Sequence, residues 1–175
     1  MIGGTVVWFT GLPASGKTTL ARRVRDRLAP RTSCVLLDSD ELRDALHEQS
    51  YSEAGRDLFY AKLARLAALL AKQGHVVLVA ATAPRIAQRA LARTEAPSFV
   101  EVYVQTSREQ CEARDPKGLY TRARGGDAPT LPGLGAAYEP PTCPEVTAES
   151  GGDADAVAKV ERYVLSYGAG SAWAG

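Results

Sequence analysis

Residues 11–18 read Gly11-Leu12-Pro13-Ala14-Ser15-Gly16-Lys17-Thr18, which fits the pattern G-x-x-x-x-G-K-T. The stretch lies between residues 5–10, an apolar and β-branched segment typical of a buried strand, and residues 18–28, which have helical periodicity. The glycines let the backbone N–H groups turn inward, and the N-terminal end of the following helix adds positive potential. The sequence therefore predicts a phosphate-binding P-loop rather than a glycine-rich turn that only joins a strand to a helix.

Such a loop predicts a site for ATP together with Mg²⁺. We expect Lys17 to reach the β- and γ-phosphates, and the Thr18 hydroxyl to hold Mg²⁺, a hard cation that bridges the same phosphate oxygens. The residues of this segment that are expected to contact ATP are Gly11, Ala14, Ser15, Gly16, Lys17, Thr18 and Thr19.

Strand-like and helix-like segments alternate along the whole chain. The expected strands are residues 5–10, 34–37, 76–80, 99–104 and 145–148. The expected helices include residues 18–28, 41–47, 53–73, 84 to about 93, 107–113 and 153 to about 167, with a basic helix around Arg122 and Arg124. This alternation predicts an α/β fold in which helices flank a parallel five-stranded sheet, as in P-loop NTPases.

The chain is expected to form one domain with a lid. Its 175 residues are enough for a single α/β core, and we place the kinase-like domain at residues 1–167. Gly, Pro and Ala dominate residues 125–144, and a long loop of this kind is usually functional. We therefore expect a lid and acceptor loop at about residues 115–144, and a flexible C-terminal tail at residues 168–175 that includes Trp173.

Charge and cysteine content limit the possible partners and location. The 21 basic and 20 acidic residues are nearly balanced, so the sequence predicts neither a nucleic-acid surface nor a membrane surface. Three cysteines without metal-ligand spacing fit free thiols in a reducing compartment. With no signal peptide or membrane-spanning segment expected, the predicted location is the cytoplasm.

The second expected strand ends in Asp38-Ser39-Asp40, and ligands of open α/β sheets bind at the carboxyl ends of strands. We therefore expect these carboxylates to face the P-loop, unless they are only helix caps. The third strand ends Val79-Ala80-Ala81-Thr82, without the aspartate that motor ATPases place there. This layout favours a small-molecule kinase with a closing lid, similar to nucleoside-monophosphate kinases.

Four further segments resemble motifs of the adenylyl-sulfate kinases, which phosphorylate the 3′-hydroxyl of adenosine 5′-phosphosulfate (APS). Residues 37–43, LDSDELR, resemble the family's D-G-D-x-x-R, and residues 51–56, YSEAGR, resemble F-S-x-x-x-R. Residues 112–120, EARDPKGLY, are similar to E-x-R-D-P-K-G-L-Y, and residues 138–140, YEP, resemble Y-E-x-P. These segments occur in the family's order over about residues 5–147, nearly the whole domain.

The resemblance implies roles for individual residues. Lys17, Asp38 and Asp40 would be catalytic, with Asp38 and Asp40 organising Mg²⁺ beside Thr18 and with Asp38 accepting the proton of the attacking hydroxyl. Arg114 would lie near the ATP adenine. The implied acceptor-binding residues are Asp40, Arg43, Tyr51, Arg56, Phe59, Thr82, Ala83, Lys117, Gly118, Leu119 and Leu131. Arg43 and Arg56 would hold the phosphosulfate, unless they are surface charges on helices. The resemblance also points to a homodimer.

The chain departs from the family pattern on the acceptor side. The family clamps the acceptor adenine between two aromatic rings; Tyr51 stands at the first position, but Leu131 stands at the second. Phe59 replaces a family asparagine, unless it is simply a core residue, and Thr82-Ala83-Pro84 replaces I-S-P. Three hypotheses remain: an APS kinase with a redrawn adenine pocket, a related kinase for a different small-molecule hydroxyl, and a nucleotide-gated binding module without catalysis.

Overall fold

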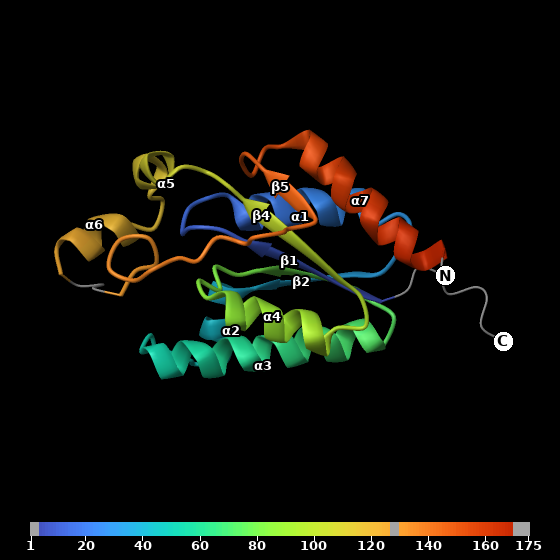
Figure 1. Cartoon of the computed structure of the whole chain (residues 1–175), viewed down its shortest axis with the longest axis horizontal. Coiled ribbons are helices and arrows are strands. Elements are labelled where there is room, and N and C mark those ends of the chain that lie inside the picture. Colours follow the sequence, from blue (N-terminus) through green and yellow to red (C-terminus); the bar gives the residue numbers. More distant parts are fainter. Residues whose placement is uncertain (1–3, 127–129, 170–175) are drawn as a thin grey trace.

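The computed structural model of the chain describes residues 4–126 and 130–169. Its central feature is a parallel sheet with strand order β2-β3-β1-β4-β5 (Figure 1). The strands of the described residues are β1 (Thr5–Thr10), β2 (Cys34–Asp38), β3 (Val76–Ala80), β4 (Phe99–Val104) and β5 (Val146–Ala148). Strand β1 lies in the middle, and its six residues are all buried. The P-loop that follows β1 is therefore attached to a buried strand at the centre of the sheet.

Helices cover both faces of the sheet (Figure 1). One face is covered by α1 (Lys17–Leu28) and α7 (Ala154–Ala169), and the other by α3 (Glu53–Lys72) and α4 (Ile86–Glu95). Alternate residues of β1 serve the two cores, because Val7 packs on the α1 side and Trp8 on the α3 side. Within the described residues, none of the helices has the length and apolar character needed to cross a membrane.

Three short helices lie at or beyond the carboxyl ends of the strands: α2 (Ser39–Ala45), α5 (Arg108–Arg114) and α6 (Leu119–Arg124). Figure 1 shows α5 and α6 projecting from the sheet on the side where β1 ends. The chain then returns across this edge before it enters β5. The elements expected to carry the site thus meet at one edge of the sheet.

The α/β fold and the five parallel strands predicted from the sequence are confirmed, with strand ends within one residue of those expected. Two helix starts were wrong. Helix α2 begins at Ser39 rather than residue 41, because the Asp38 side chain already accepts hydrogen bonds from the N–H groups of Asp40 and Glu41. Helix α4 begins at Ile86 rather than residue 84, because its N-cap Arg85 has an extended backbone, with φ −99° and ψ 137°.

The segment after α6 is more ordered than a structureless loop. The Leu131 carbonyl accepts hydrogen bonds from the N–H groups of Leu134, Gly135 and Ala136, which closes a tight turn. At the other end of the chain, α7 continues to Ala169, past the predicted domain boundary at residue 167. The rest of the predicted tail, including Trp173, lies outside the described residues, and the boundaries of domain, lid and tail remain predictions.

Candidate active site

The P-loop folds back on itself at the end of β1. Gly11, Ala14 and Gly16 all have positive φ angles, of 151°, 62° and 100°. At Gly16 a side chain is also excluded by space, because an added Cβ would lie 2.7 Å from the backbone nitrogen of Gly151. The left-handed conformation of Ala14 costs about 1–2 kcal/mol, which surrounding packing must offset. The loop is thus held in the shape of an anion cradle.

Lys17 lies over this loop as the first residue of α1. Its Nζ donates to the carbonyls of Gly11, at 3.0 Å, and Leu12, at 2.7 Å. Burial lowers the pKa of Lys17 to about 8, and the nearby carboxylates of Asp40 and Asp38 only partly oppose this effect. A desolvated ammonium group held beside an anion cradle interacts strongly with phosphate, because little water must be displaced.

Ser15 adds a hydrogen-bonding group that has no partner of its own. Within the described residues, its Oγ and the Trp8 Nε1 are the buried side-chain polar atoms without a hydrogen bond. The Ser15 carbonyl accepts a 2.8 Å hydrogen bond from Thr106 Oγ1, which lies just beyond β4. The loop is therefore anchored to the sheet while its inner hydroxyl is available to an anion.

The Asp38 carboxylate faces the P-loop, as the sequence suggested. Its Oδ2 accepts a 2.5 Å hydrogen bond from the Thr18 hydroxyl. Its Oδ1 accepts from the backbone N–H of Asp40 at 2.9 Å and of Glu41 at 3.4 Å. The two interpretations of Asp38 are thus compatible, because one oxygen caps α2 and the other lies at the site.

The residues around Thr18 suit Mg²⁺. This ion prefers oxygen ligands and is usually held by one or two protein oxygens, phosphate oxygens and water. The Thr18 hydroxyl and the Asp38 carboxylate supply such oxygens next to the phosphate cradle. No cluster of three or more His, Cys, Asp or Glu side chains placed to hold a metal occurs among residues 4–126 and 130–169. Thr18 and Asp38 therefore fit an ion shared with a nucleotide, and a contact between Asp40 and that ion remains a prediction.

Asp40 lies on the outer side of the same turn and pairs with Lys117. The Asp40 Oδ2 to Lys117 Nζ distance is 2.7 Å, and both side chains are largely exposed. This hydrogen bond raises the pKa of Lys117. Lys117 precedes Gly118, whose φ of 62° starts α6. The pair joins the start of the predicted lid to α2, on the side expected to bind the acceptor.

Arg43 is buried between two aromatic rings. Its side chain is 5% exposed, and its Cζ lies 3.8 Å from the ring centroid of Phe59 and 4.7 Å from that of Tyr51. The Nη1 donates to the carbonyls of Glu48 and Ser50. The alternative of a surface charge on a helix is therefore wrong for Arg43. Phe59 is fully buried and supports the guanidinium from the core side.

Arg56 links helix α3 to the loop after α6. Its Nη2 donates to the carbonyl of Thr130 at 2.6 Å and to the Thr130 hydroxyl at 2.9 Å. Burial lowers the pKa of Arg56. Arg114, by contrast, is exposed at the end of α5. Arg56 and Lys117 both tie the predicted lid segment to the acceptor side.

Two other predicted acceptor residues, Ala83 and Leu131, are buried, and a third, Thr82, is partly buried. Ala83 is fully buried, and Leu131 is 8% exposed in a cluster with Cys111 and Tyr120. The backbone carbonyl of Thr82 accepts a 2.6 Å hydrogen bond from Thr10 Oγ1. A direct contact with an acceptor remains a prediction for each of the three, as it does for Phe59 and Leu119.

Sequence reasoning missed several residues at this edge of the sheet. Arg89 is 2% exposed and donates to the carbonyls of Ala83 and Glu139. Its four-residue spacing from Arg85 and Arg93 is typical of a solvated helix face, which concealed its role. Tyr138 was noted only as part of a motif. Its ring lies 6.3 Å from that of Tyr103, nearly parallel to it.

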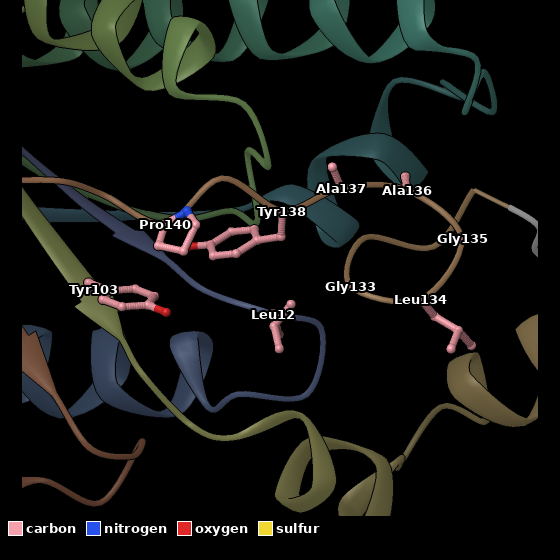
Figure 2. A pocket seen from close by; sticks show the side chains of 9 residues that line it. All are labelled: Leu12, Tyr103, Gly133, Leu134, Gly135, Ala136, Ala137, Tyr138 and Pro140. Carbon is pink, nitrogen blue, oxygen red and sulfur yellow. The ribbon is translucent and has the colours of Figure 1, made fainter.

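A cavity of about 570 Å³ lies between the P-loop and the loop after α6. Figure 2 shows that it is lined by the rings of Tyr103 and Tyr138, by Leu12 of the P-loop and by residues 133–137. None of its lining side chains is charged. The cavity therefore borders the phosphate cradle without being an anion site itself.

Comparisons with known proteins agree with this geometry. The family model described as adenylylsulphate kinase matches residues 3–149. The adenylyl-sulfate kinase of Vibrio cholerae serotype O1 is 41% identical over 150 residues, which cover 83% of this chain and 70% of that protein. An APS kinase of Mycobacterium tuberculosis, solved in complex with AMPPNP and APS, is 35% identical with a TM-score of 0.82 over 95% of this chain and 98% of that chain. A hexameric APS kinase from Thiobacillus denitrificans is 27% identical with a TM-score of 0.65, over 94% of this chain and 28% of that chain.

Proposed function

This chain belongs to the adenylyl-sulfate kinase family, and we propose that it transfers the γ-phosphoryl group of ATP to the 3′-hydroxyl of APS. The products would be 3′-phosphoadenylyl sulfate and ADP. The observation that carries the proposal is the meeting of two elements at one edge of the sheet. Lys17 and Thr18 of the P-loop face Asp38 at the end of β2, and Thr18 and Asp38 are 2.5 Å apart.

In this proposal the P-loop binds and orients the triphosphate of ATP. The backbone N–H groups of residues 11–18, the Ser15 hydroxyl and the Lys17 ammonium stabilise negative charge on the phosphates. Thr18 and Asp38, with Asp40 nearby, would hold Mg²⁺, which when bound neutralises charge on the β- and γ-phosphates. The leaving ADP is stabilised by the same groups, because they contact its terminal phosphate.

The acceptor hydroxyl then attacks the γ-phosphorus in line with the leaving oxygen. The new bond joins the 3′-oxygen to the γ-phosphorus, and the bond to the β–γ bridging oxygen breaks, its electron pair leaving with ADP. Asp38 accepts the hydroxyl proton. Arg43, Arg56 and Lys117 supply the positive charge that binds the anionic phosphosulfate. The loop between residues 115 and 144 would close over the site and exclude water, which would otherwise hydrolyse ATP.

A second candidate is phosphorylation of a different small-molecule hydroxyl by the same machinery. It is favoured by the placement of Phe59 and Leu131, which are both buried and which leave Tyr51 as the exposed aromatic ring of the acceptor side. One stacked ring contributes about 1–3 kcal/mol to the binding of a nucleobase. An acceptor without a nucleobase would lose no binding free energy from the missing second ring.

A third candidate, a binding module without catalysis, has no need of the Thr18–Asp38 arrangement.

The deciding experiment measures ADP release from Mg·ATP with and without APS. The first proposal predicts turnover that depends on APS at micromolar concentration, with 3′-phosphoadenylyl sulfate as product. A screen of other alcohols under the same conditions tests the second candidate. Absence of ADP release with APS, together with release for another acceptor, would replace the first proposal by the second.

Three finer expectations belong to the same proposal. The reaction would serve sulfate assimilation or sulfonation, and the protein would work in the cytoplasm. A homodimer is expected from the family resemblance, whereas one related APS kinase is described as hexameric. Measuring the mass of the purified chain in solution would distinguish these assemblies.

A further inference from the structure

We propose that Arg89 is a positioning residue that shapes the floor of the acceptor pocket, by fixing the turn after β3 to the loop that leads into β5. This inference rests on the proposed function in one respect, namely that an acceptor binds at this edge of the sheet. Arg89 belongs to α4 and bonds to the backbone carbonyl of Ala83, one of the predicted acceptor residues.

Arg89 uses its three guanidinium nitrogens in three directions. Its Nε donates to Glu101 Oε1 on β4 at 2.8 Å, its Nη1 to the Ala83 carbonyl at 2.6 Å, and its Nη2 to the Glu139 carbonyl at 2.6 Å. The side chain is 2% exposed. A planar guanidinium directs its N–H groups at fixed angles, so these three contacts determine where the two loops lie relative to β4.

The turn that Arg89 holds is strained. Ala83 has a φ of 37°, in the left-handed region that residues with a Cβ rarely adopt. Because such a conformation persists only when surrounding contacts determine it, the bond from Arg89 to the Ala83 carbonyl helps to keep the turn in place.

The same turn is tied to the segment around Glu139 by contacts that do not involve Arg89 directly. The Ile86 N–H donates to Glu139 Oε2 at 2.7 Å, and the Glu139 N–H donates to the Pro84 carbonyl at 2.8 Å. The hydroxyl of Tyr138 lies 3.0 Å from Thr10 Oγ1, which in turn donates to the Thr82 carbonyl. Arg89 thus belongs to a network of hydrogen bonds that joins the acceptor side to the end of β1.

This arrangement predicts that loss of the guanidinium affects the acceptor and not ATP. The turn after β3 lies next to β1 and β2 at the carboxyl edge, where the acceptor hydroxyl must approach. The P-loop has an anchor of its own, the hydrogen bond from Thr106 Oγ1 to the Ser15 carbonyl. A shift of the turn therefore misplaces the acceptor while the phosphate cradle is preserved.

The test is Arg89→Lys, with Arg93→Lys as matched control. A lysine keeps the charge beside Glu101, so the fold is preserved, but an ammonium on a straight stem does not reach both carbonyls with the geometry of the fork. We expect the KM for the acceptor to rise by about 10- to 100-fold, as for misplaced reacting groups, with the KM for ATP unchanged. Arg93 contacts Glu101 and also Glu145, directly before β5, but it bonds to neither the Ala83 nor the Glu139 carbonyl, so we expect its replacement to leave both constants unchanged.

A second measurement does not depend on the identity of the acceptor. Amide hydrogen exchange at Ile86 and Glu139 reports the bonds that join the two loops, and we expect it to become at least about tenfold faster in Arg89→Lys. If that variant fails to fold, Arg89→Met with Glu101→Gln removes both charges together and avoids a buried unpaired carboxylate. The same two readouts then apply.

The outcomes separate this inference from the proposed function. A wild-type protein that turns over ATP with APS, together with an Arg89 variant whose acceptor KM and amide exchange are unchanged, overturns the inference alone. Equal rises in both KM values overturn it too, because they indicate a general loss of structure. A wild-type protein inactive with APS overturns the proposed function, whereas faster exchange at Ile86 and Glu139 in the variant still supports the role of Arg89.

Discussion

Residues 11–18 place Lys17 and Thr18 within one continuous turn of backbone, whereas the acceptor side draws Arg43, Phe59 and Thr130 from three separate segments. The groups that face ATP are mostly backbone N–H groups and two adjacent side chains, so they depend on local conformation. The groups on the acceptor side depend on each other, since Arg43 is held between Tyr51 and Phe59 and Arg56 is bonded to Thr130. The phosphate cradle therefore tolerates little change, while the acceptor pocket can be altered by single substitutions in its supporting layer.

The largest loss of activity is expected for a substitution on the ATP side, at Lys17. Lys17→Ala removes the ammonium that lies over the P-loop, and the turnover number should fall by at least about 100-fold, because a preorganised charge at the transferring phosphate is lost. ADP release measures the rate, and circular dichroism checks the fold. Arg27→Ala on the same helix removes an exposed charge that pairs with Glu161 on α7 and serves as control. Wild-type turnover in Lys17→Ala would contradict the assigned role.

Leu131→Phe sharpens the contrast by testing whether Leu131 faces the acceptor or the core. Because Leu131 is buried against Cys111 and Tyr120, we expect the larger ring to lower the free energy of unfolding by about 1–3 kcal/mol through overpacking. Urea denaturation measures this change. Leu134→Phe, at the cavity of about 570 Å³, should cost less and is the control. A tighter acceptor KM in Leu131→Phe would instead place the new ring against the acceptor.

The pH dependence of ATP binding tests the electrostatics of the ATP side. The pKa of Lys17 is lowered to about 8 in the free protein, and bound phosphates raise it again. ATP binding should therefore take up a proton as the pH rises above about 8, and affinity should fall by up to about tenfold per pH unit. Calorimetry in buffers of different ionisation enthalpy measures the proton uptake. Lys17→Met should abolish it, and uptake that persists in this variant would assign the proton to another group.

The smallest effect is expected for the pair that joins the lid segment to α2. Because the side chains of Lys117 and Asp40 are 61% and 58% exposed, Lys117→Gln should change the free energy of unfolding by less than about 1 kcal/mol. The exposed pair of Arg22 and Glu41 provides the matched variant Arg22→Gln. Thermal melts at low and high salt measure both. A larger loss in Lys117→Gln alone would mean that this pair holds the lid closed in the free protein.

Much of the fold was predictable because its signals are local. The apolar runs of the strands, the glycines of the P-loop and the caps of the helices act within a few residues of themselves, and the order of elements then restricts the topology. The approximate site was predictable for a related reason, since Asp38 ends a strand whose carboxyl end must lie at the same edge as that of β1. The errors concern the exact ends of helices, such as the start of α2, which the Asp38 cap places at Ser39.

The acceptor side was less predictable because its contacts are not local. Nothing in the spacing of Arg85, Arg89 and Arg93 distinguishes the buried arginine from its two more exposed neighbours. The strain at Ala83 and the stacking of Arg43 on Phe59 arise only when distant segments pack together. The surroundings of these side chains therefore could not be derived from the sequence, and their roles toward an acceptor remain predictions.

The sequence by itself determined that a P-loop follows a buried strand and that two carboxylates end the next strand, because those features depend on neighbouring residues and on periodicity. Only the tertiary structure decided what each arginine side chain contacts. Arg43 lies against two aromatic rings, Arg56 bonds to Thr130, and Arg89 bonds to two loops. Burial of a charge is set by the segments that pack around it, and these segments lie far apart along the chain.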